Sequence, residues 1–220
     1  MPAQRDFVPA LGKPEFTSAY DKVIAVMTRE RRWRPLVVKA LAPAPCETVV
    51  DIGAGTGSQA ILLKSQTPGI RMIGIDPDPQ VLAIARAKAG AAGAEIEWHE
   101  GFGDETHDHL GERFADAVVS SLVLHQCPVD VKSGILASAF RVLKPGGRLV
   151  VADYGLQRSF LMRTLFRQVQ MADGFEYTQP NADGILDRLI PAAGFTALEE
   201  RHVVPTHTGS ISIFCATKPV

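Results

Sequence analysis

The feature that most constrains this chain is a glycine-rich segment that directly follows a run of β-branched residues. Residues 48–58 read TVVDIGAGTGS. The apolar β-branched residues suit a central parallel strand covered on both faces, and Gly53, Gly55 and Gly57 allow a sharp turn with room for a ligand. Ser58 and the apolar residues after it predict a helix whose N-terminal amides face the same space. We therefore expect a ligand at this strand, turn and helix.

Two aspartates strengthen this expectation. Asp76 ends the next apolar strand, residues 72–76. It lies about 20 residues beyond the last glycine, where a carboxylate can accept hydrogen bonds from the ribose hydroxyls of a nucleotide-like ligand. Asp51 precedes the first glycine by two residues and can orient the loop or reach the ligand through water. The pattern predicts a nucleotide-like ligand.

Residues 51–57, DIGAGTG, resemble the first signature motif of the class I S-adenosylmethionine-dependent methyltransferases. The resemblance implies S-adenosylmethionine as cofactor and S-adenosylhomocysteine as its product. A competing interpretation is an NAD(P)-dependent oxidoreductase with a Gly-x-Gly-x-x-Gly fingerprint, which Ser58 fits imperfectly, whereas Asp51 and Gly57 fit the methyltransferase pattern. A third interpretation, a catalytically idle cofactor-binding scaffold, stays open.

Other segments resemble the same family from about Thr17 to the end of the chain. Residues 141–147, RVLKPGG, match the turn before its fifth strand, and residues 195–203 and 211–217 match its antiparallel final pair. The resemblance implies an α/β, Rossmann-like fold. Its seven-stranded sheet is mostly parallel with an antiparallel last strand, helices on both faces, N-terminal helices and a lid insertion after strand five.

Length and composition fit one domain over residues 1–220, since 220 residues with 46% hydrophobic content can fill a single core. Residues 1–45 are expected to form an N-terminal helical cap, whose second helix should hold Pro35 in its first turn. This cap resembles the ubiquinone/menaquinone-biosynthesis type within the family. A last helix should open at Asn181 or Asp183.

Residues 154–180 are expected to form the lid insertion. Their apolar positions alternate with Arg158, Arg163 and Arg167 in helical fashion, which predicts an amphipathic and locally basic helix. Insertions at this place cover the acceptor site in the family. A lid packed on the domain is favoured over peripheral contact with a membrane surface.

The resemblance also places the remaining contacts of the donor. In the family the turn after the third strand, residues 100–104 here, flanks the adenine. Relatives often carry an acidic residue where this chain has Phe102. Stacking by Phe102 or a backbone contact is preferred to a hydrogen bond that Asp104 would accept from the adenine amino group. Ser121 is expected at the amino acid end of the donor. The expected contacts are Asp51, Gly53, Gly55, Thr56, Gly57, Asp76, Pro77, Gly101, Phe102, Ser121 and Leu122.

Two residues are candidates for catalysis. His125 follows the predicted fourth strand, residues 117–120, and an imidazole can accept a proton near neutral pH. An equally open alternative is a helix-start histidine bonded to backbone. Tyr20 either faces the acceptor or simply packs. The expected reaction is in-line methyl transfer to an oxygen, carbon or nitrogen of a small molecule.

Charge and cysteine content limit the partners. A net charge of −1 gives no electrostatic reason to expect nucleic acid. Three scattered cysteines and the isolated run of residues 107–109 lack metal-ligand spacing, so no metal is expected. The absence of a signal-like segment or an apolar run of about 20 residues predicts a cytoplasmic protein. The expected partner is a small acceptor, apolar or lipophilic, and the sequence is compatible with a homodimer.

Overall fold

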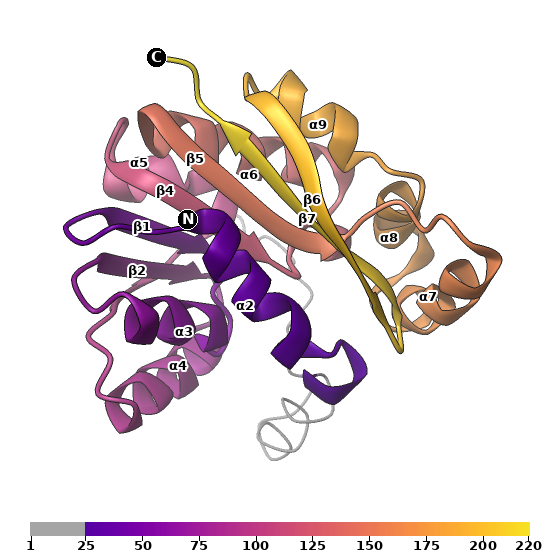
Figure 1. The fold of residues 1–220 in the computed structure, drawn as a ribbon, viewed down its shortest axis with the longest axis horizontal. Coiled ribbons are helices and arrows are strands. Elements are labelled where there is room, and N and C mark those ends of the chain that lie inside the picture. The colour runs from indigo at the N-terminus through magenta and orange to yellow at the C-terminus, as the bar shows by residue number, and fades with distance from the viewer. Residues whose placement is uncertain (1–24) are drawn as a thin grey trace, which may run out of the picture.

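The computed structural model describes residues 25–220, and these residues build one mixed sheet flanked by helices (Figure 1). In order across the sheet, its seven strands are β3 (Glu97–Glu100), β2 (Arg71–Asp76), β1 (Thr48–Ile52), β4 (Ala115–Ser121), β5 (Leu143–Tyr154), β7 (Gly209–Thr217) and β6 (Thr196–Thr206). In this described sheet β7 pairs antiparallel with both β5 and β6, and the other neighbouring strands pair in parallel. The predicted α/β fold, with a seven-stranded, mostly parallel sheet, is confirmed.

Helices cover both faces of the sheet. The α-helices described are α2 (Glu30–Leu41), α3 (Ser58–Gln66), α4 (Pro79–Ala91), α5 (Thr106–Leu110), α6 (Val129–Val142), α7 (Phe160–Asp173), α8 (Phe175–Ala182) and α9 (Leu186–Ala192). Two short 3-10 turns, η2 (Gly103–Glu105) and η3 (Leu124–Gln126), follow β3 and β4. In Figure 1, α2 crosses in front of the sheet and α6 lies behind it.

Two hydrophobic clusters, one on each side of the sheet, form the core. The first joins α2 and α3 to the sheet through side chains such as Trp33, Leu41 and Leu63. The second joins α6 and α9 through Ile135 and Ile190. Because β1 is covered by both clusters, its run of valines and isoleucine is buried, as expected for a central parallel strand.

The structure corrects the position of Pro35. Helix α2 begins at Glu30, so Pro35 lies inside the helix and not in its first turn. The earlier start brings Trp33 into the core, where its Nε1 donates to the carbonyl of Thr28 at 3.1 Å. Pro35 is exposed. The carbonyl four residues earlier, which lacks a hydrogen bond because proline has no N–H, can therefore accept one from water. The first 24 residues of the expected N-terminal cap, Tyr20 among them, lie outside the described residues.

Two other predicted boundaries are wrong. Residues 144–147 belong to β5, whose pairing with β4 is irregular between Ala115 and Ala117, so they are not a separate turn. The last helix starts at Leu186, and not at Asn181 or Asp183. Asn181 belongs to the preceding helix, α8. The Asn181 amide is buried and donates to the carbonyl of Tyr154 at 2.9 Å, which fixes α8 against the end of β5.

The start of α4 offers a direct test of the local structure. The Asp78 side chain accepts from the backbone amides of Gln80 and Val81, and Pro79 occupies the first helical position. Asp78→Ala should lower the free energy of unfolding in urea by about 1 kcal/mol. The control is Glu95→Ala at an exposed site, which should change it by less than about 0.5 kcal/mol. Equal effects would contradict the cap.

Candidate functional site

The carboxyl ends of β1, β2 and β4 open onto one cavity of about 1080 Å³. The sheet order reverses between β1 and β4, and ligands of open α/β sheets bind at such a switch point. Cavities that hold small ligands usually measure about 300–1,000 Å³, so this one has room for more than one small molecule. Its walls also include residues of α2, α4, α6 and α7.

The three glycines of the first loop have left-handed backbone angles, with φ of 69°, 54° and 79°. A Cβ at Gly53 would lie 2.3 Å from Val123, and one at Gly57 would lie 2.6 Å from Trp98. A Cβ at Gly55 would meet no atom within 4 Å, and Gly55 lines the cavity. The outer two glycines therefore permit close packing, and Gly55 leaves room for a ligand.

Asp76 holds this loop in place at the edge of the cavity. Its Oδ2 accepts from the amide of Gly55 at 2.8 Å, and its Oδ1 accepts from the amide of Asp78 at 3.0 Å. Burial raises the pKa of Asp76, while these hydrogen bonds oppose the change. Since Asp76 also lines the cavity, it combines a structural role with a carboxylate that a ligand can reach.

Asp51 is the most unusual polar group of the site. It is fully buried, and within residues 25–220 neither carboxylate oxygen has a hydrogen-bond partner. Burial raises the pKa of Asp51 to about 7, opposed by the charge of Arg34 and assisted by that of Asp76. A buried carboxylate without a partner is costly. The position of Asp51 behind the loop therefore suits a hydrogen-bond donor that belongs to a ligand. This feature fits the amino acid end of the predicted donor.

Arg34 is a cavity residue that the sequence analysis did not select. It projects from α2, pairs with Glu30 at 2.7 Å and stacks on the Trp33 ring at 4.5 Å. Its guanidinium also donates to the Gln59 side chain at 3.4 Å, and the Gln59 amide nitrogen is buried without a partner among the described residues. The basic run at residues 29–34 was the available signal, although it does not single out one arginine.

The opposite side of the loop contains Lys88, which was also not predicted. Its ammonium donates to the hydroxyls of Thr56 and Ser58, both at 2.9 Å, and so ties α4 to the loop. Thr56, Pro77 and Phe102 line the cavity near this point, together with Asp104. The aromatic ring of Phe102 and these polar groups suit a flat heterocyclic ligand.

The structure brings most of the predicted donor contacts to one cavity. Ser121 and Leu122 line it at the end of β4. Asp51, Gly57 and Gly101 lie behind the wall and do not line it. A Cβ at Gly101 would lie 2.4 Å from the His109 ring, so this glycine serves packing between the turn and α5. These placements describe the site without testing each contact.

His125 lies at the other end of the cavity, and Asp153 fixes its orientation. Asp153 is the penultimate residue of β5, and its Oδ1 contacts Nδ1 of His125 at 2.7 Å. Its Oδ2 accepts from the backbone amides of Val123, Leu124 and His125 at 3.1, 2.7 and 3.3 Å. Oδ1 also accepts from the amide of Tyr154. Asp153 is thus a fully bonded buried carboxylate that holds η3 and the imidazole together.

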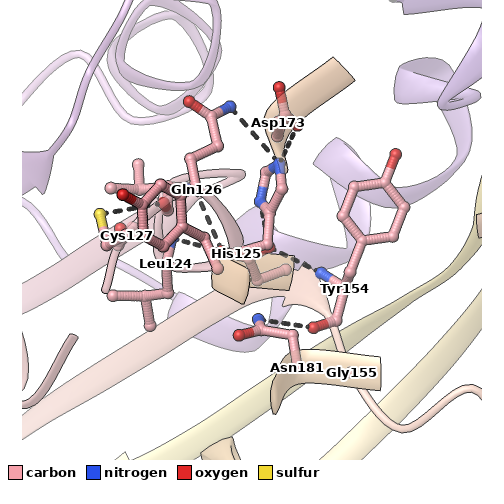
Figure 2. Close-up of polar contacts among 12 residues, drawn as sticks. Leu124, His125, Gln126, Cys127, Tyr154, Gly155, Asp173 and Asn181 are labelled. Atoms are coloured by element: carbon pink, nitrogen blue, oxygen red, sulfur yellow. Dashed lines mark hydrogen bonds and ion pairs between the residues drawn. The ribbon is translucent and has the colours of Figure 1, made fainter. Parts of the chain in front are cut away.

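The second ring nitrogen of His125 faces the end of α7 (Figure 2). Its Nε2 lies 3.4 Å from Oδ2 of Asp173, the last residue of α7, and 3.4 Å from the amide nitrogen of Gln126. Burial disfavours the charged ring, but the charges and hydrogen bonds of Asp153 and Asp173 outweigh it and raise the pKa of His125 to about 9. His125 is therefore protonated at neutral pH.

The wall around His125 is largely apolar and aromatic. The ring contacts Tyr154 edge to face at 4.9 Å, and Tyr154 contacts Phe166 of α7 at the same distance. Val169 and Ala172 of α7 line the cavity beside them. Such a wall suits a flat apolar molecule with a polar edge near His125. Within the described residues, no group of histidine, cysteine or acidic side chains is arranged to hold a metal ion.

Comparison with known proteins gives consistent matches. Residues 49–147 match the family described as "Methyltransferase domain". The chain is 37% identical to a demethylmenaquinone methyltransferase of Deinococcus radiodurans, over 63% of this chain and 56% of that protein. It is 34% identical to the Thermus thermophilus protein of the same name, over 64% and 63%. The matches thus span less than two thirds of these relatives.

A solved structure agrees with the fold. It is described as a putative methyltransferase from Bacillus halodurans, with a TM-score of 0.69 and 18% identity. The superposition covers 85% of this chain and 99% of that one. At this level of identity, the likeness concerns the fold alone.

The charge on His125 should make stability depend on pH. Its pKa rises on folding from 6.5 to about 9, so the folded state keeps a proton that the unfolded state releases between these values. The stability gained is complete below about pH 6.5 and is lost as pH rises toward about 9, by roughly 3 kcal/mol. The gap in unfolding free energy between wild type and His125→Gln should therefore shrink over this range in urea titrations. A constant gap would contradict the charged ring.

Proposed function

We propose that this chain, which belongs to the class I S-adenosylmethionine-dependent methyltransferases, transfers a methyl group to a ring carbon of a quinol-like small molecule. The observation that carries the donor side is the unpartnered, buried Asp51 behind an open glycine loop. The acceptor side draws on the names of the two curated relatives and on the apolar wall around His125.

The donor fits along the ends of β1 and β2. Asp76 would accept from its ribose hydroxyls, while Phe102 and Pro77 would flank its adenine. Asp51 and Arg34 would face the opposite charges of its amino acid end, which is an ammonium and a carboxylate. This arrangement would satisfy the carboxylate that burial otherwise leaves without a partner.

When bound, the donor supplies an activated methyl group on a sulfonium. The residues of this chain then act mainly by position, because an in-line displacement requires the two reacting atoms in contact and water excluded. In this transfer the methyl–sulfur bond would break with its electron pair left on sulfur, a carbon–carbon bond would form, and the proton of the ring carbon would pass to solvent. Tyr154 and Val169 would hold the acceptor ring against the donor.

His125 would contact the acceptor's oxygen. The sequence suggested a base, and a base requires an unprotonated ring. Since the pKa of His125 is about 9, its ring carries the proton at neutral pH and would donate a hydrogen bond to that oxygen. This hydrogen bond would favour the ionised form of the acceptor's hydroxyl, and a phenolate has more electron density than a neutral phenol at the neighbouring ring carbon, which is the atom that attacks. His125 would become a base only in the alkaline range.

Helix α7 would act as the lid over the acceptor. Its inner face, with Gln168 and Val169, lines the cavity, while Phe160 and Met171 are 87% and 80% exposed on the outside. This outer face suits the peripheral membrane contact considered from the sequence, as a route for a lipophilic acceptor. No helix among the described residues is long and apolar enough to cross a membrane. The homodimer and the cytoplasmic location stay predictions.

The donor site can be tested at Gly55. Gly55→Ala should lower the affinity for S-adenosylhomocysteine by roughly tenfold or more, because the added methyl group enters the ligand's space. The matched control is Gly93→Ala, since Gly93 has a similar φ of 64°, also has no atom within 4 Å of an added Cβ, and lies outside the cavity. Calorimetric titration measures both. Equal affinities in the two variants would refute the donor site.

The reaction can be tested with 1,4-naphthohydroquinone under anaerobic conditions. The protein and S-adenosylmethionine should yield 2-methyl-1,4-naphthohydroquinone and S-adenosylhomocysteine in equal amounts by mass spectrometry. Gly93→Ala should retain this activity, and Gly55→Ala should lose most of it at low donor concentration. Donor binding without any methylated product would refute the acceptor class. Binding of NADH in place of S-adenosylhomocysteine would favour an oxidoreductase instead.

A further inference from the structure

The ring of His125 presents one nitrogen to the acceptor side of the cavity. Asp153 holds Nδ1 at 2.7 Å and is itself engaged by backbone amides, so this carboxylate is committed to structure. His125 is 3% exposed and lines the cavity. Only Nε2 of the ring is therefore left to bind a ligand.

The two neighbours of Nε2 require opposite states of the ring. The side-chain amide nitrogen of Gln126 is a hydrogen-bond donor and suits an unprotonated Nε2. The Asp173 carboxylate is an acceptor and suits a protonated Nε2. The Asp173 contact, at 3.4 Å, is longer than the roughly 2.7–2.9 Å of a strong charge-assisted hydrogen bond. The carboxylate is thus attracted to the ring without a close bond to it.

Asp173 occupies an unfavourable position for a carboxylate. It is the last residue of α7, and the last turn of that helix carries no basic residue. A negative charge at a helix C-terminus is repelled by the helix dipole, so the nearby imidazolium compensates for an otherwise costly position. The side chain keeps 21% of its surface exposed, and Gly174 follows it with a φ of 90°. Asp173 can therefore leave the ring for solvent more easily than Asp153 can.

We propose that Nε2 of His125 is the subsite for an anionic oxygen of the acceptor, and that the Asp173 carboxylate occupies this place until the acceptor replaces it. The acceptor class is then phenolates and enolates, and amines are disfavoured. Two negative groups cannot share one imidazolium at close range without a cost, so binding of the acceptor's oxygen displaces Asp173. This inference rests on the proposed function, since it specifies the acceptor of that same site.

The test compares two ligands that differ in charge and have the same ring system. The probe is 2-hydroxy-1,4-naphthoquinone, an enol that is ionised at neutral pH, and its control is 2-methoxy-1,4-naphthoquinone, which is neutral. Wild type should bind the hydroxy compound at least about tenfold more tightly, as a charge-assisted hydrogen bond in a desolvated site should contribute. Calorimetric titration at constant pH measures both affinities.

Three variants separate the roles of the charged groups. His125→Gln should abolish the preference for the hydroxy compound. Asp173→Asn should strengthen binding of that compound by roughly threefold or more, because a competing anion is removed, and should leave the methoxy compound unchanged. Asp130→Asn, at another cavity-lining carboxylate, should change neither affinity. Histidine NMR of the Asp173→Asn variant should show a lowered pKa of His125.

Several outcomes would overturn the inference. They are a preference that survives His125→Gln, hydroxy-compound binding that weakens in Asp173→Asn, or no preference in wild type. Titration of each variant with S-adenosylhomocysteine provides the check on folding and on the donor site. If a protein shows one of these outcomes but still binds S-adenosylhomocysteine, the acceptor subsite alone is refuted. If wild type does not bind S-adenosylhomocysteine, the proposed function is refuted.

Discussion

The site depends first on the parallel pairing of β1 with both β2 and β4. In this register Ile52 lies beside Ile75 on one side and Ser120 on the other. Three strands therefore end at the same edge of the sheet, and their last residues deliver side chains to one cavity. A slip of one residue would turn the buried valines of β1 toward the wrong layer and scatter these groups. The buried apolar core thus determines the geometry of the polar site.

Three aspartates at strand ends divide the site by how completely they are bonded. Asp153 is fully engaged and holds His125, and Asp76 is engaged by the loop but still reaches the cavity. Asp51 has no partner among the described residues. In the proposed site the bonded carboxylate would build the acceptor side, while the unbonded one would mark the place of a positively charged ligand group. The same chemical group therefore performs different tasks because its surroundings differ.

Much of the fold was available from the sequence, since a buried strand with a glycine turn and the alternating apolar patterns are local signals. The Asp-Pro pair that caps α4 is a local signal of the same kind. Pro35 was misplaced because burial of Trp33 depends on tertiary packing, which overrides the preference of proline for a first turn. The contact of His125 with Asp173 joins η3 to α7 across 48 positions of the sequence, so no local pattern reveals it. Arg34 was hidden within a run of similar charges.

The most direct measurement of the central claim is a crystal structure of the protein with S-adenosylhomocysteine. The account predicts the ribose at Asp76, the adenine beside Phe102, and the amino acid end within hydrogen-bond distance of both Asp51 and Arg34. It also predicts that the space beside His125 stays open for the acceptor. Density for the ligand elsewhere, such as in the surface groove lined by Arg71 and Trp98, would contradict the account. So would a bound ligand that leaves Asp51 without a partner.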